Sequence, residues 1–167
     1  WASGTRVVHY GADIVSDLIR SHAKEFSDRP WSGSFFVHDF VGGPHRQQVD
    51  LIYSRQMTMH LSHRDACAVL RGFSRSGARF LLATTFLTTE DNGDGLDFAA
   101  ITRENVGSFV PQNLQLPPFD LPPPIYMARD DPATPQNYLA LWRLPLPSSA
   151  CRASTLASVQ YKTGVTL

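Results

Sequence analysis

The sequence predicts an α/β protein with a mostly parallel sheet that ends in an antiparallel C-terminal edge strand. Segments of strand and helix character alternate through the first half of the chain, and a hairpin pattern follows near the end. Residues 79–86 are almost all apolar or β-branched, which is typical of a strand covered on both faces. At 167 residues and 43% hydrophobic content, the chain is long enough to bury the core of one domain.

The first elements form a strand–helix–strand succession. Residues 6–15 are rich in β-formers and predict a strand. Residues 16–26 carry apolar side chains at three- and four-residue steps, which predicts an amphipathic helix that ends before Pro30. A second strand is predicted over 34–40, and a glycine–proline turn follows it.

A second helix is predicted between two further strands. Residues 49–54 predict the first of these strands, and 79–86 predict the second. Ser62 and Asp65 have the spacing of a capping box at the start of the helix. Gly77 is placed to end the helix in the left-handed conformation.

The rest of the chain is less regular. Residues 88–95 are polar and predict a surface loop. Six prolines in 111–124 exclude a helix or central strand, so we expect an ordered extended segment over the edge of the sheet. Residues 125–129 and 138–144 predict an antiparallel pair. We therefore expect one domain over 1–147 and a C-terminal tail over 148–167.

Charge and composition limit the function classes. Lys plus Arg and Asp plus Glu number 15 each, which gives no strong nucleic-acid signal. Arg71, Arg75 and Arg79 lie close in sequence, and we interpret them as a solvated helix end. No apolar run is long enough to cross a bilayer, so we expect no membrane insertion and a soluble intracellular protein, with cytoplasm and organelle both open. Cys67 is expected to be a buried free thiol.

Two carboxylates at predicted strand ends are the main candidates for ligand binding. In an open α/β sheet, ligands bind outside the carboxyl ends of the strands. A carboxylate at Asp13 suits two adjacent ribose hydroxyls, because it accepts two hydrogen bonds at once. Asp39 is placed to accept from a purine amino group, and Phe40 to stack on the base. The alternative is that both acids are only helix caps or turn formers.

A metal site is not predicted. His38, His45, His60 and His63 do not have the spacing of a zinc site. Residues 91–94 (DNGD) hint at a calcium loop, but they lack the remaining ligands and the terminal glutamate, so a polar loop is favoured.

Several segments, in order along the chain, resemble class I methyltransferases that depend on S-adenosylmethionine, and in particular small uncharacterised members of that superfamily. The resemblance covers most of residues 8–144. The matching stretches are 10–15 (YGADIV), 50–61 (DLIYSRQMTMHL), 73–86 (FSRSGARFLLATTF), 113–119 (NLQLPPF) and 139–142 (LALW).

The resemblance implies a Rossmann-like sheet of seven strands and S-adenosylmethionine as cofactor. Asp13 would hold its ribose, and Asp39 with Phe40 its adenine. Three consecutive residues at the end of the fourth strand of the family, Ser54, Arg55 and Gln56, would lie beside the sulfonium and the methyl acceptor. His60 is the candidate general base, with a structural histidine as the alternative. Pro118 and Phe119 are candidates for a wall of the acceptor pocket.

The chain departs from the resembled family in two ways. Gln56 stands where an acid is usual, which weakens a role in proton removal or in binding the amino group of the cofactor. The first strand of the family, its Gly-rich loop and the following helix would belong before Trp1, in the middle of the sheet. Without them, exposed backbone groups at two strand edges are costly, so we expect a fragment of a longer gene product or a neighbouring chain in that slot.

Two function hypotheses follow, and a third is disfavoured. The first is an active methyltransferase whose acceptor class is open. The second is a catalytically silent, methyltransferase-like subunit held among protein partners in a larger assembly. A nicotinamide-dependent dehydrogenase shares the fold class, but the segments after residue 54 and the terminal hairpin suit methyltransferases better.

Overall fold

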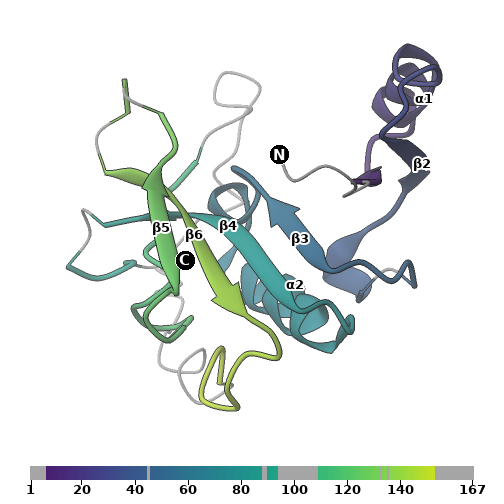
Figure 1. The fold of residues 1–167 in the computed structure, drawn as a ribbon. Helices are drawn as coiled ribbons and strands as arrows, with labels where there is room; N and C mark the ends of the chain where they lie inside the picture. The colour runs from purple at the N-terminus through teal and green to yellow at the C-terminus, as the bar shows by residue number, and fades with distance from the viewer. Residues whose placement is uncertain are drawn as a thin grey trace, which may run out of the picture. The chain divides into compact units, whose positions relative to one another are not determined.

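A computed structural model describes residues 7–44, 46–87, 90–93, 109–131, 133–134 and 136–152. The chain divides into two compact units, one over residues 1–40 and one over 41–167 (Figure 1). Among the described residues, the first unit contains a two-stranded sheet and the second a four-stranded sheet. The predicted elements are confirmed in order, with boundaries shifted by a few residues.

The first unit is a parallel strand–helix–strand unit. It consists of β1 (His9–Asp13), α1 (Ser16–Glu25) and β2 (Ser32–Val37). Phe35 lies over β1 so closely that a Cβ atom on Gly11 would come within 2.4 Å of its ring. Glycine at this position therefore allows the aromatic ring to cover the neighbouring strand.

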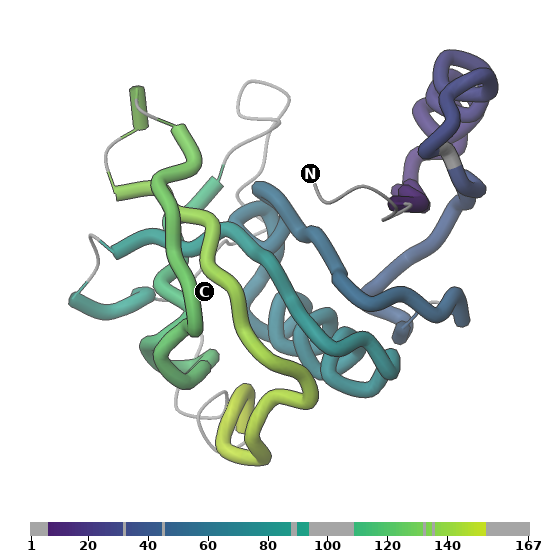
Figure 2. Tube along the Cα trace, viewed as in Figure 1, coloured from purple at the N-terminus to yellow at the C-terminus, as the bar shows by residue number. Residues whose placement is uncertain are grey.

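The second unit is built on a mixed sheet with the strand order β3-β4-β6-β5. The parallel pair is β3 (Leu51–Ser54) and β4 (Phe80–Phe86). The C-terminal hairpin is β5 (Tyr126–Arg129) and β6 (Asn137–Arg143), in which β6 runs antiparallel to both β4 and β5. The antiparallel hairpin is thus confirmed, with β5 as the outermost strand (Figure 2).

Helix α2 (His63–Arg75) contributes most of the helical part of the core. The Ser62 hydroxyl accepts a hydrogen bond from the Asp65 amide at 3.1 Å and donates one to its carboxylate at 2.8 Å, which confirms the predicted cap. Gly77 follows the helix with φ of +86°, as expected for a left-handed helix end. The buried stripe of the helix includes Ala66, Cys67, Val69, Leu70 and Phe73.

The proline-rich segment is ordered without a helix or strand, as predicted, but it does not follow the edge of the sheet. Gln112 accepts from the Phe86 amide of β4, and the Trp142 indole of β6 donates to the Pro122 carbonyl. These bonds go to the two inner strands. The physical reason is that Leu114 and Phe119 are fully buried, so the segment completes the core.

The predicted tail also begins with a packed stretch. Cys151 is buried, its amide donates to the Phe119 carbonyl at 2.8 Å, and its carbonyl accepts from Arg71 at 2.9 Å. Residues up to 152 therefore belong to the packed part of the second unit. The boundary at 147 stays a prediction.

The two cysteine thiols are both buried and free, which confirms the expectation for Cys67. A hydrogen bond with Cys67, reinforced by burial, raises the pKa of Cys151 well above its ordinary value of 9.0. Both thiols are buried, and the raised pKa keeps Cys151 in the less reactive thiol form, so we expect neither cysteine to be alkylated by iodoacetamide in the native protein. Rapid alkylation under native conditions would contradict this packing.

The same pKa shift has a consequence for stability. The Cys151 thiol ionises at lower pH in the unfolded chain than in the folded protein. Its contribution to the free energy of unfolding is therefore complete below pH 9 and is lost as the pH rises further. In urea titrations above pH 9, we expect the wild type to lose stability more steeply than Cys151→Ala. Parallel losses in the two proteins would be the contrary result.

Six strands are present among the described residues, against seven in the resembled fold. Within that part of the chain, β1 pairs only with β2, and β3 only with β4. The second edges of β1 and β3 are therefore unpaired there.

Candidate functional site

The carboxyl ends of β1 and β2 are direct neighbours in the first unit. Asp13, the last residue of β1, is in register with Val37, the last residue of β2. Beyond it, the His38 amide donates to the Asp13 carbonyl at 3.0 Å. Asp39 is the next residue, so the backbones that carry both acids leave the same edge of this sheet.

The Asp13 carboxylate has a local structural partner. Its Oδ1 accepts a hydrogen bond from the Val15 amide at 2.8 Å, immediately before α1. This is the turn-forming role that the alternative interpretation predicts. Oδ2 makes no hydrogen bond to a described residue, so one oxygen has capacity for a ligand donor.

Asp39 and Phe40 follow β2 at the end of the first unit. Asp39 is exposed. The Phe40 ring contacts the His38 ring edge-on, with centroids 4.6 Å apart. The adenine-binding role of Asp39 and Phe40 stays a prediction.

In the second unit, Ser54 ends β3 with its side chain turned inward. It is 7% exposed, and its Oγ has no hydrogen-bond partner among the described residues. A buried hydroxyl without a partner is unfavourable in a folded protein. A polar ligand bound at the carboxyl end of β3 would give the Ser54 hydroxyl a hydrogen-bond partner.

Arg55 forms an ion pair with Asp130, a residue that the sequence patterns do not indicate as part of a site. Its Nε donates to both carboxylate oxygens of Asp130, at 2.9 and 3.1 Å, and the Asp130 side chain is only 4% exposed. The hydrogen bond to Asp130, and then its negative charge, raise the pKa of Arg55 above its ordinary value. Arg55 is therefore tied to the loop after β5, and the predicted cofactor role would have to be shared with this ion pair.

Gln56 occupies a constrained turn. Its φ is +52°, in the left-handed region that non-glycine residues seldom adopt, and its amide donates to Thr84 Oγ1 at 2.8 Å. The exposed side chain offers an amide where the resembled family has an acid. Sustained strain of this kind is common at ligand sites.

The other predicted site residues have different surroundings. His60 ends a short 3-10 helix, η2 (Thr58–His60), is exposed, and faces the Phe109 ring at 6.2 Å. Phe119 is fully buried and Pro118 is buried beside it, so the described chain places both in the core. Their role as a wall of the acceptor pocket stays a prediction.

Local sequence patterns did not point to two of the polar groups that shape this end of the second unit. Asp130 and Asn92 both lie in stretches that read as surface loops. Asn92 is 4% exposed and bonds to the Asn113 backbone in both directions, accepting at 2.7 Å and donating at 2.9 Å. Their partners lie 75 and 21 residues away, so local sequence gives no signal for them.

Within the described ranges, no group of three or more His, Cys, Asp or Glu side chains is arranged to hold a metal ion. In the same part of the chain, no helix has the length and apolar character needed to cross a membrane.

Comparison with known proteins identifies the fold. No protein-family model matches the chain, and no curated protein sequence matches it. Among solved structures, it is similar to the PH0226 protein from Pyrococcus horikoshii OT3, with a TM-score of 0.55 and 14% identity over 84% of this chain and 72% of that one.

Two further structures carry functional descriptions. The CMeT domain of the citrinin polyketide synthase has a TM-score of 0.53 and 16% identity, over 84% of this chain and 40% of that one. Magnesium protoporphyrin IX methyltransferase (ChlM) from Synechocystis PCC 6803, solved with bound SAH, has a TM-score of 0.52 and 13% identity, over 82% of this chain and 64% of that one. The chain thus spans less than two thirds of the length of both proteins.

These similarities establish a class I methyltransferase-like fold of the Rossmann-like type. The strand orders of the two units agree with the fold class predicted from the sequence. At identities of 13–16%, the comparisons concern the fold, and the methyltransferase descriptions suggest a function without establishing one.

Proposed function

We propose that the protein is a methyltransferase that uses S-adenosylmethionine. The observation that carries the proposal is the position of Asp13 and Asp39 at adjacent carboxyl ends of a parallel strand pair, in a chain with a methyltransferase-like fold. Nucleosides bind at this edge of open α/β sheets. The acceptor is left open, since the methyltransferases it resembles at the level of fold are distant in sequence.

The donor set fits the cofactor. Asp13 retains an oxygen with no partner among the described residues, and Ser54 has a buried hydroxyl in the same condition. Carboxylates suit ribose hydroxyls and a purine amino group, and the hydroxyl suits a polar part of the ligand. Bound S-adenosylmethionine would supply a methyl group on a sulfonium, which is activated for in-line displacement.

The roles of the residues follow from this assignment. Asp13 accepts from the ribose hydroxyls and Asp39 from the adenine amino group, while Phe40 stacks on the base. In the second unit, Ser54 is the residue that the resemblance assigns to the reacting part of the cofactor. His60, which is exposed, takes a proton from an acceptor that has one to lose.

Cofactor titrations test the proposal through Asp13→Asn. Asparagine keeps the oxygen that accepts from the Val15 amide, so the turn before α1 should persist. It replaces the second oxygen with an NH₂ group and removes the charge, at a cost of about 1.5–3 kcal/mol for a hydrogen bond to a charged group. We expect S-adenosylmethionine to bind the full-length variant roughly ten- to a hundredfold more weakly in calorimetry.

Asp28→Asn is the matched control. Asp28 is exposed in the same unit, after α1, and should be neutral for binding. If the wild type does not bind the cofactor, or if both variants bind as the wild type does, the assignment fails.

A silent methyltransferase-like subunit is the second candidate. Two observations favour it: the commitment of Arg55 to Asp130, and the amide of Gln56 in place of an acid. The two candidates differ in turnover. Release of S-adenosylhomocysteine above the buffer rate, with any of a panel of hydroxyl, amine and carboxylate acceptors, would exclude the silent subunit.

A further inference from the structure

Arginines from α2, from the residue before β4 and from the end of β6 gather at the end of the second unit opposite Ser54. Arg75 lies in the last turn of α2, Arg79 precedes β4, and Arg143 ends β6. Phe80 and Arg143 are paired in register at this end of the sheet. The sequence shows Arg71, Arg75 and Arg79 as neighbours, and the fold adds Arg143 from a distant part of the chain.

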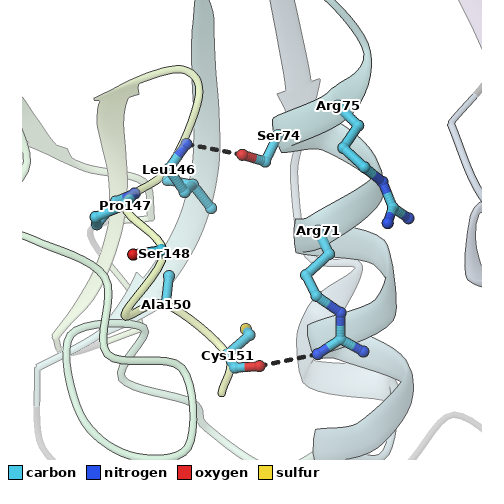
Figure 3. A pocket seen from close by; sticks show the side chains of 8 residues that line it. All are labelled: Arg71, Ser74, Arg75, Leu146, Pro147, Ser148, Ala150 and Cys151. Carbon is cyan, nitrogen blue, oxygen red and sulfur yellow. Dashed lines mark hydrogen bonds between the residues drawn. The ribbon is translucent and has the colours of Figure 1, made fainter. Parts of the chain in front are cut away.

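Two adjoining hollows lie among these arginines, and together they are named the arginine hollow. The smaller one, of about 210 Å³, is bounded by α2 and the loop after β6, and Arg71 and Arg75 line it (Figure 3). The larger one, of about 490 Å³, is lined by Arg75, Arg79 and Arg143. Ser74 and Arg75 line both, so the two hollows meet at α2.

The arginine charges are not neutralised locally. Within the part of the chain that the structure describes, none of these four arginines forms an ion pair with a carboxylate. The neighbouring Asp50 accepts from the Arg79 and Phe80 amides through its backbone carbonyl. The chain as a whole has a formal charge of zero, so this is a local concentration of positive charge.

Structural roles account for only part of the cluster. Arg71 is held by the Cys151 carbonyl, and Arg75 is favourably placed near the negative end of the dipole of α2. Arg79 and Arg143 instead both lie over the Phe80 ring, with their guanidinium carbons 5.4 and 5.6 Å from its centroid. Two cations brought to one ring repel each other, and a bound anion would relieve that repulsion.

We propose that the arginine hollow is a binding site for a small ligand that carries two or more phosphate groups. Guanidinium groups bind phosphate through paired, charge-assisted hydrogen bonds. Two adjoining hollows, one beside Arg71 and one beside Arg79 and Arg143, suit two linked phosphates better than one. The site lies at the amino ends of β3 and β4, at the opposite end of β3 from Ser54.

A compact ligand is favoured over a nucleic acid chain. The larger hollow, of about 490 Å³, has the size of a small-molecule site, which is commonly about 300–1,000 Å³. Nucleic acid backbones are instead bound along extended basic tracks, often with exposed aromatic rings for base stacking. Here the Phe80 ring already has arginines against it.

Calorimetric titration of the full-length protein with inorganic pyrophosphate tests the proposal. We expect the double variant Arg75→Gln/Arg143→Gln to weaken binding by about tenfold or more, since each guanidinium supplies charge-assisted hydrogen bonds. Arg75→Lys/Arg143→Lys should lose less, because lysine keeps the charge without the planar fork. Arg64→Gln, at the other end of α2, is the control and should bind as the wild type does.

Each outcome of this titration either supports or overturns the phosphate site. Selective loss in the glutamine variant, with an unchanged melting temperature, supports the site. The single variant Arg143→Gln replaces the double variant if the latter is unfolded. Absence of pyrophosphate binding by the wild type, or equal loss in Arg64→Gln, overturns the proposal. So does tighter binding of a short labelled single-stranded oligonucleotide through the same arginines, which would make the face a nucleic-acid surface.

Discussion

Replacing Phe119 with alanine should lower the free energy of unfolding by about 3–5 kcal/mol, the usual cost of removing a buried aromatic side chain. Phe119 is fully buried, and the His63 ring meets it edge-on with centroids 5.3 Å apart. Its backbone carbonyl also anchors Cys151, so a cavity here should loosen the segment after β6. Urea titration followed by circular dichroism measures the loss.

Two comparisons show whether Phe119 acts as a core residue. Tyr126→Ala removes an aromatic side chain that is 63% exposed on β5, and it should cost a small fraction of the Phe119 effect. Phe119→Leu, which fills most of the space, should fall between the two. A small stability loss for Phe119→Ala, together with altered acceptor affinity, would instead assign Phe119 to a substrate pocket.

Replacing Asn92 with alanine should also be strongly destabilising, by at least about 2 kcal/mol. The Asn92 side chain accepts from the Asn113 amide and donates to the Asn113 and Pro117 carbonyls. Alanine would leave the Asn113 amide and the Pro117 carbonyl without the Asn92 side chain, whereas the Asn113 carbonyl would keep the Leu116 amide. Each buried group that loses its partner costs about 1–3 kcal/mol. The midpoint of thermal or urea unfolding measures the effect.

Variants of the same loop give the controls. Glu90→Ala changes an exposed side chain two residues away and should leave stability within about 0.5 kcal/mol of the wild type. Asn92→Asp keeps the acceptor for the Asn113 amide but turns a carboxylate oxygen toward two carbonyls. Its stability should therefore improve as the pH falls and the acid is protonated. An Asn92→Ala protein as stable as Glu90→Ala would refute the role of Asn92.

The elements were predictable because their signals are local. The Ser62–Asp65 cap, the left-handed Gly77 and the apolar run of β4 all act within a few residues, and the structure contains each of them. The strand ends that place Asp13 and Asp39 follow from the same local patterns.

The long-range polar contacts were not predictable. Asn92 lies in a run of Asp, Asn and Gly that is typical of a surface loop, yet its partners are in the proline-rich segment. Asp130 looks like a turn residue, and only the fold brings it to Arg55. Prolines cannot join a ladder, so the sequence predicts the proline-rich segment at the edge of the sheet. Burial of Leu114 and Phe119 instead takes the segment to the inner strands.

Amide chemical shifts of the full-length protein, recorded with and without S-adenosylhomocysteine, test the central claim most directly. If one nucleoside lies across the carboxyl ends of β1 and β2, the largest shifts should fall at Asp13, His38 and Asp39. Asp28, after α1, should not move. Saturable binding that leaves Asp13 and Asp39 unshifted, or an absence of binding, would contradict the account.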